Sequence, residues 1–183
     1  EPWITFVCDE QSPRNITTLR QSDPATTFKP LLKPHIAFGF RQAACWFRWE
    51  MRNTGTQTRR LLFVVDYPVL DHVDLYQDSQ RSLTHWALGD ALAFSQRQID
   101  SRSFVIPLTL EPGQIATYYL RAQSSGSMTV PLYVSDHDNF IGMHERNEWL
   151  LGIFYGISLG LLFYHAFLWG VLREKIYRFY VLH

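Results

Sequence analysis

The chain has 183 residues, of which 17 are Lys or Arg and 17 are Asp or Glu, so its formal charge at neutral pH is zero. This balance argues against a nucleic-acid-binding protein, which needs clustered positive charge to replace the counterions around phosphates. Hydrophobic residues make up 46% of the chain and aromatic residues 15%, but they are unevenly distributed, and the length allows one or two domains.

The first 144 residues contain about eight short runs that are apolar or alternating and are separated by turn residues. The clearest run is 45–53, in which Trp46 and Arg48 fall on one face and Phe47 and Trp49 on the other. This period of two predicts a β-strand. The other predicted strands are residues 4–8, 61–67, 72–77, 83–88, 104–110, 116–123 and 128–135.

This spacing of strands, with no convincing helix before residue 144, predicts an all-β domain. We expect a jelly-roll β-sandwich, in which two antiparallel sheets close face to face around one core. Residues 12–33 are predicted to form a long irregular connection, and residues 136–146 a short polar tether between the sandwich and a membrane.

Residues 149–172 are predicted to be a transmembrane helix, because this stretch of 24 residues contains no Lys, Arg, Asp or Glu. About 20 apolar residues are enough to cross the hydrocarbon core of a bilayer. Trp149 and Trp169 lie near its ends, where indole rings anchor a helix at the membrane interface.

The excess of basic residues after the span, at Arg173, Lys175 and Arg178, places that side in the cytoplasm. The predicted organisation is therefore a periplasmic domain over 1–144, a first transmembrane helix over 145–172, and a cytoplasmic loop with the start of a second transmembrane helix over 173–183. No basic segment followed by a short apolar run opens the chain, so we expect that a signal peptide was removed or that the chain is a fragment.

Cys8 and Cys45 are the two cysteines of the chain. An even count in an oxidising compartment permits one disulfide. The sequence does not show whether their Cα atoms approach closely enough for a bridge, so a disulfide and two buried free thiols both stay open.

Several blocks of the sequence resemble the type 2 extracytoplasmic domain of bacterial seven-transmembrane receptors with diverse intracellular signalling modules. The block at 38–53, FGFRQAACWFRWEMRN, has an aromatic-glycine pair, a Trp near the start of a strand, an Arg two residues on and a closing Asn; Cys45 departs from the usual pattern. Further blocks follow in the same order at residues 67–76, 88–98, 104–114 and 118–134.

This resemblance implies a jelly-roll sensor similar to carbohydrate-binding modules. In such receptors the sensor lies in the periplasm, and seven helices in the bacterial inner membrane couple it to an output such as a histidine kinase or a diguanylate cyclase. The region present carries no HExxH, GxSxG, CxxC or P-loop motif, so we expect that it is not itself an enzyme. A homodimer is expected.

The expected ligand is a carbohydrate or a small solute, because sugar sites combine aromatic faces with planar polar groups that pair with hydroxyls. The candidate ligand-binding residues are Trp46, Arg48, Trp86, Asp90, Arg97 and Arg121. A structural role is the alternative for each of them: Trp46 as a core residue, or Arg97 paired with Asp90 to hold a turn. We also expect Trp86, Asp90 and Arg97 to share one surface.

Calcium is the second ligand class considered, with Asp136 and Asp138 as candidate oxygen ligands; no other cofactor is expected. A structural module that reports dimer state and binds nothing small is the third hypothesis. Within the span, Gly152, Gly156 and Gly160 recur every four residues and are predicted to form a helix-packing face, either between protomers or within one receptor's own bundle.

Overall fold

The computed structural model describes residues 4–9, 14–31, 37–40, 43–79 and 82–172. The chain forms two compact units, Glu1–His137 and Asp138–His183. The strands of the described residues all lie in the first unit, and the described part of the second unit belongs to the long C-terminal helix.

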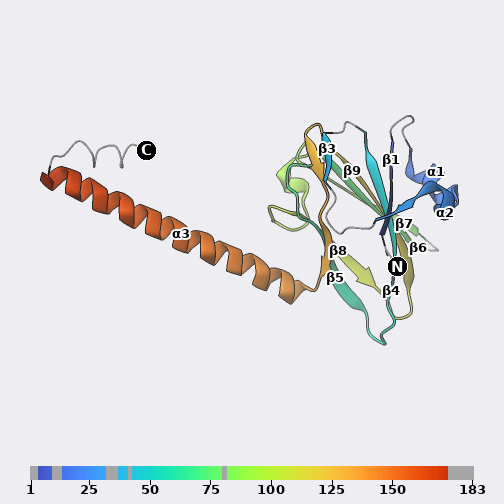
Figure 1. Cartoon of the computed structure of the whole chain (residues 1–183). Helices are drawn as coiled ribbons and strands as arrows, with labels where there is room; N and C mark the ends of the chain where they lie inside the picture. Colours follow the sequence, from blue (N-terminus) through green and yellow to red (C-terminus); the bar gives the residue numbers. More distant parts are fainter. Residues whose placement is uncertain (1–3, 10–13, 32–36, 41–42, 80–81, 173–183) are drawn as a thin grey trace. The chain divides into compact units, whose positions relative to one another are not determined.

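The largest sheet has six strands in the order β2-β1-β4-β9-β6-β7, and its paired strands are antiparallel (Figure 1). Its strands are β2 (Lys29–Pro30), β1 (Ile4–Cys8), β4 (Cys45–Arg52), β9 (Ile115–Gln123), β6 (His72–Ser79) and β7 (Ser82–Leu88). A second sheet has three strands, β11 (Leu132–Ser135), β5 (Arg59–Val65) and β8 (Phe104–Leu110). A small third sheet pairs β10 (Ser127–Thr129) with β3 (Ala37–Phe40).

The core lies between the six-stranded and the three-stranded sheets. Alternate residues of each strand point inward, so Trp49 of β4 and Tyr118 of β9 stack at 5.5 Å on one side of the core. Trp49 also stacks on Phe63 of β5 at 5.0 Å, a contact that joins the two sheets. The predicted all-β sandwich is therefore confirmed, while the jelly-roll topology stays a prediction.

The described ranges contain eleven strands where the sequence predicted about eight. Two of the added strands, β2 and β3, are only two and four residues long. The third arises because the predicted strand 128–135 is divided at Pro131 into β10 and β11. Proline cannot donate a hydrogen bond to a neighbouring strand, which explains the division.

The connection that was predicted to be irregular contains two short helices, α1 (Ile16–Gln21) and α2 (Pro24–Thr27). Asn15 caps α1, because its side chain accepts a hydrogen bond from the Thr18 amide while the Thr18 hydroxyl accepts one from the Asn15 amide. Asp23 caps α2 in the same manner by accepting from the Ala25 amide. The expectation of no helix before residue 144 is therefore wrong.

The C-terminal helix, α3 (His137–Leu172), begins inside the segment that was predicted to be a polar tether. No proline interrupts residues 137–148, so the helix that contains the apolar stretch already begins at His137. Residues 149–172 form the part that is long and apolar enough to span a membrane. The predicted loop at 173–183 lies outside the described residues.

Candidate functional site

The outward face of the six-stranded sheet carries a group of polar and aromatic side chains. Successive side chains of a strand point to opposite faces, so the antiparallel register brings every second residue of four neighbouring strands together here. From β4 through β9 and β6 to β7, these side chains are Trp46, Arg48, Tyr119, Arg121, Asp74, Tyr76 and His85.

Asp74 is the centre of the charged part of this face. Its carboxylate accepts a hydrogen bond from the Arg121 guanidinium at 3.2 Å, and its second oxygen lies 3.0 Å from His85 Nε2. Arg121 also donates to the side-chain oxygen of Gln123. These side chains remain partly exposed, at 19% for Asp74, 28% for Arg121 and 44% for His85, so a solute can reach them. Such exposed ion pairs add little to stability.

Tyr76 supplies the aromatic surface beside these charges. Its ring stacks on the His85 imidazole with centroids 4.3 Å apart and planes 7° apart, and on Trp46 at 5.8 Å. Burial raises the pKa of Tyr76, the nearby Asp74 charge raises it further, and Arg121 lowers it in part. The phenol therefore stays neutral at physiological pH and can both donate and accept a hydrogen bond. We call Asp74, Tyr76, His85, Arg121 and Gln123 the Tyr76 patch.

Residues 14–28, the crossing segment, cover part of this face. Leu19 and Phe28 pack against Trp46 and Tyr119 in a small apolar cluster that is separate from the main core. As a result Trp46 is only 1% exposed and Tyr119 only 5%. Ligand contact by Trp46 stays a prediction, and it requires that the segment over the indole moves first.

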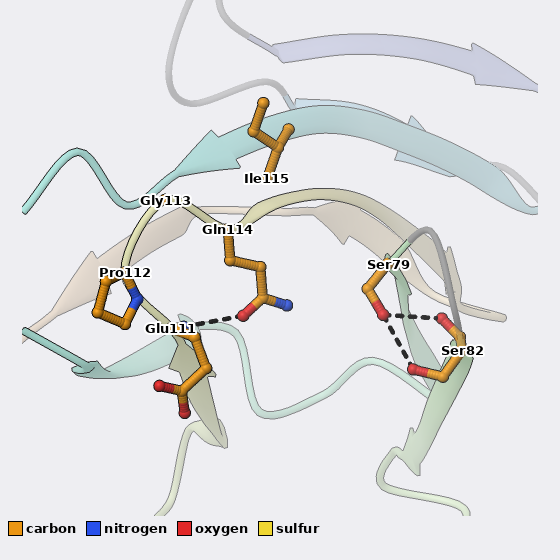
Figure 2. Close-up of a pocket in the computed structure, with 7 residues that line it drawn as sticks. All are labelled: Ser79, Ser82, Glu111, Pro112, Gly113, Gln114 and Ile115. Carbon is orange, nitrogen blue, oxygen red and sulfur yellow. Dashed lines mark hydrogen bonds between the residues drawn. The ribbon is translucent and has the colours of Figure 1, made fainter.

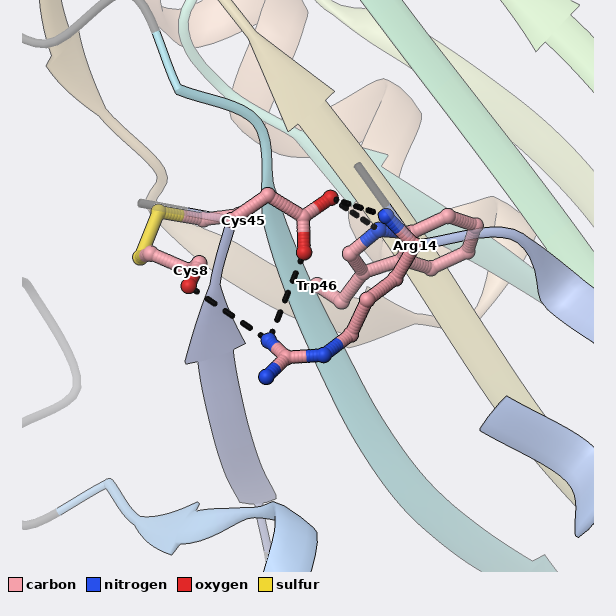
Figure 3. The surroundings of a disulfide bond; sticks show 5 residues. Cys8, Arg14, Cys45 and Trp46 are labelled. Atoms are coloured by element: carbon pink, nitrogen blue, oxygen red, sulfur yellow. Dashed lines mark hydrogen bonds and ion pairs between the residues drawn. A yellow bond between two sulfur atoms is a disulfide. The ribbon is translucent and has the colours of Figure 1, made fainter. Parts of the chain in front are cut away.

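Two polar contacts hold the crossing segment in place. In the middle of the segment, Arg20 of α1 donates through Nε and Nη2 to the two carboxylate oxygens of Asp78, at 2.8 and 3.0 Å. At the start of the segment, the Arg14 amide donates to the Asp9 carboxylate at 3.0 Å, and the same carboxylate accepts from the Trp46 indole at 3.2 Å (Figure 3). A bidentate arginine–carboxylate pair is the stronger geometry for such a contact.

A disulfide joins Cys8 to Cys45, and Figure 3 shows it next to Trp46 and Arg14. The two cysteines are directly paired positions of the neighbouring strands β1 and β4, with Cα atoms 4.0 Å apart. The loop closed by this bond contains the whole crossing segment, so the disulfide fixes where that segment begins.

Trp86 lies away from the Tyr76 patch, on the inward face of β7 at the side of the sandwich. It lines a cavity of about 190 Å³, which Gln96 and Gln98 also line. The other lining residues are His85, Ala87, Leu88, Val105 and Ile106. A volume below the usual range for ligand pockets leaves room for only a small solute.

Arg97 holds the loop that carries these two glutamines. Its guanidinium donates to the carbonyls of Ser101 and Arg102 at 2.6 and 3.2 Å and lies 4.7 Å from the centre of the Phe94 ring. These contacts assign Arg97 a positioning role in the loop. Asp90 is exposed at the preceding turn, and no ion pair between it and Arg97 occurs in the described part of the chain. Their predicted shared surface therefore stays untested.

A larger cavity of about 650 Å³ lies at one end of the sandwich, between the β6–β7 hairpin and the turn from β8 to β9. Figure 2 shows Ser79 and Ser82 on one side and Glu111 and Gln114 on the other. Its remaining lining residues are Pro112, Gly113 and Ile115. Because none of its lining residues is aromatic, this cavity fits a sugar less well than the Tyr76 patch does.

The other predicted positions lie at the end of the sandwich and on α3. Asp136 and Asp138 are both exposed, and no group of three potential metal-ligating side chains of His, Cys, Asp or Glu occurs among the described residues. Calcium binding stays a prediction. On α3, Gly152, Gly156 and Gly160 are exposed and have open space where a Cβ would lie. Beyond the adjacent backbone of α3 itself, no described residue lies within 4 Å of these Cβ positions, and their role in helix packing stays a prediction.

Sequence reasoning missed Asp74, Tyr76, His85 and Gln123. A signal was present for two of them, because the alternation in residues 72–77 places Asp74 and Tyr76 on the face opposite Val73 and Leu75. Their meeting with Arg121 depends on the pairing of β6 with β9, across more than forty residues of chain, which local patterns do not reveal.

A family model described as 7TMR-DISM extracellular 2 matches residues 1–136. The match covers the whole β-sandwich and is followed by one helix, residues 149–172, that could span a membrane. A comparison with curated proteins finds no match. An extracellular receptor domain followed by such a helix indicates a membrane protein with its β-sandwich outside the cytoplasm. The region described is therefore a sensing part and not itself a catalytic one.

Proposed function

Because this chain belongs to the 7TMR-DISM extracellular 2 family, we propose that its β-sandwich binds a carbohydrate or a small polar solute on the Tyr76 patch. The membrane helix then passes the binding event to a signalling output in a bacterial inner-membrane receptor. A histidine kinase or a diguanylate cyclase, in a homodimeric receptor, is the output that the family resemblance favours.

The observation that carries this proposal is the stacked Tyr76–His85 pair beside the Asp74–Arg121 bridge. A sugar presents C–H groups on its ring faces, which pack on aromatic rings, and hydroxyl groups at its edges. The Tyr76 patch offers a carboxylate as acceptor, a guanidinium as donor, and an amide that can do both. Charge-assisted hydrogen bonds of this kind give both affinity and orientation.

Calorimetry on the whole chain in nanodiscs, titrated with neutral mono- and disaccharides, tests this proposal. Asp74→Asn keeps the shape of the side chain but removes its charge, so we expect sugar affinity to fall roughly ten- to hundredfold. The matched control is Asp100→Asn, at an exposed loop residue, which should bind as the wild type does. Wild-type chain that binds no sugar, or equal affinities for the two variants, would contradict the proposal.

A further inference from the structure

Arg48 is a partly buried arginine on the outward face of the six-stranded sheet, and no carboxylate among the described residues pairs with it. Its Nε is buried and has no hydrogen-bond acceptor. Within the described residues, its terminal nitrogens likewise make no hydrogen bond and no ion pair. The guanidinium carbon lies 6.0 Å from the centre of the Tyr119 ring, and this cation–π contact is the one interaction that its charge makes there.

Two other arginines at this face, the partly buried Arg121 and the exposed Arg20, are each paired with a carboxylate. Arg121 pairs with Asp74, and Arg20 pairs with Asp78 through two hydrogen bonds. Arg48 differs because its register neighbours in β1 and β9 are neutral residues, Thr5 and Tyr119. Among the described residues, no ion pair therefore balances the charge of Arg48.

A charge that has lost part of its hydration is stabilised only by a paired charge or by full hydrogen bonding. A cation–π contact of this length supplies a small part of that stabilisation. The burial of Nε also holds the guanidinium at one position, so its free terminal nitrogens form a fork that matches the two oxygens of a carboxylate. Because the Arg48 side chain is already held in place, binding an acceptor there would cost little of its side-chain entropy.

We propose that the ligand is an acidic oligosaccharide whose carboxylate docks on Arg48 while a neighbouring sugar ring lies on the Tyr76 patch. This inference rests on the proposed function and adds the class of sugar to it. Arg48, Tyr119 and Tyr76 are consecutive positions of one row across β4, β9 and β6. Phe28 of the crossing segment covers Tyr119 in the middle of this row, so a ligand that contacts both Arg48 and Tyr76 passes around that segment. Two strand spacings separate Arg48 from Tyr76, about 10 Å, which is longer than one sugar ring. The ligand therefore contains at least two sugars.

The test compares digalacturonic acid with its dimethyl ester, which keeps the sugar and removes the negative charge. Calorimetry on the whole chain in nanodiscs should show the acid binding roughly ten- to hundredfold more tightly than the ester. Arg48→Gln should abolish this preference, and Arg48→Lys should restore only part of it, because lysine lacks the fork. The matched control Arg52→Gln changes an exposed arginine on the same face of the same strand and should keep the preference.

A second measurement needs no variant. Raising sodium chloride from 50 to 500 mM should weaken binding of the acid and leave binding of the ester unchanged, because salt screens the charge. Equal binding of acid and ester would overturn the inference and leave the proposed function standing. If sodium acetate or sulfate binds in an Arg48-dependent way but neither disaccharide binds, both the inference and the proposed sugar function are overturned.

Discussion

Removing the Cys8–Cys45 disulfide should lower the free energy of unfolding of the sandwich by about 4 kcal/mol. The two cysteines are 37 residues apart, and closing a loop of that length in the unfolded chain costs about 13 cal/mol/K of entropy. The folded state loses little in return, because the bond joins directly paired residues of neighbouring strands that remain hydrogen-bonded along β1 and β4. The double variant Cys8→Ala/Cys45→Ala is the perturbation.

Urea unfolding followed by tryptophan fluorescence measures this difference on the whole chain in detergent micelles. With a slope of about 1 to 3 kcal/mol/M, the midpoint should fall by roughly 1.3 to 4 M. Dithiothreitol should produce the same fall in the wild type and no further fall in the double variant. A wild-type midpoint that does not respond to reductant would refute the reasoning, since it would mean that the two thiols are not bonded.

Three further predictions follow from the core, the loop and the membrane helix. An unfolded tyrosine ionises near pH 10, whereas burial raises the pKa of Tyr118 to about 12. The free energy of unfolding should therefore fall as pH rises between these values, and Tyr118→Phe should remove roughly 2 to 3 kcal/mol of this fall in urea titrations. Arg97→Ala should lower the unfolding free energy by about 1 to 3 kcal/mol through its lost carbonyl contacts, and an unchanged stability would contradict its positioning role. Ser95→Cys, at an exposed position, should react with a membrane-impermeant maleimide from the periplasmic side, and reaction only after the inner membrane is opened would contradict the topology.

The strands and the membrane span could be predicted because their signals are local. Alternation in residues 45–53 predicted β4 and assigned Trp46 and Arg48 to one face, as the structure has them. The apolar composition of residues 149–172 predicted the helix that can span a membrane. Both patterns follow directly from side-chain period and chain length.

A core position for Trp46 was one of the two alternatives from the sequence, but the way it is covered could not be predicted, because the cover comes from residues 14–28, a separate part of the chain. Leu19 and Phe28 cover the indole only after two short helices form and cross the sheet. Asn15 and Asp23 cap these helices in the structure, but a helix of four to six residues is stable only through such tertiary contacts, so the sequence analysis predicted an irregular connection instead. The composition of the Tyr76 patch likewise depends on strand register.

Ligand contact at the Tyr76 patch is tested most directly by the imidazole resonances of His85 in micelles, identified by their loss in His85→Gln. The account predicts that these resonances shift as sugar is added and that the shift saturates at the affinity found by calorimetry. Because His85 stacks on Tyr76 and lies beside Asp74, a bound sugar ring must change its surroundings. Calorimetric binding of the sugar that leaves the His85 resonances unmoved would contradict the account.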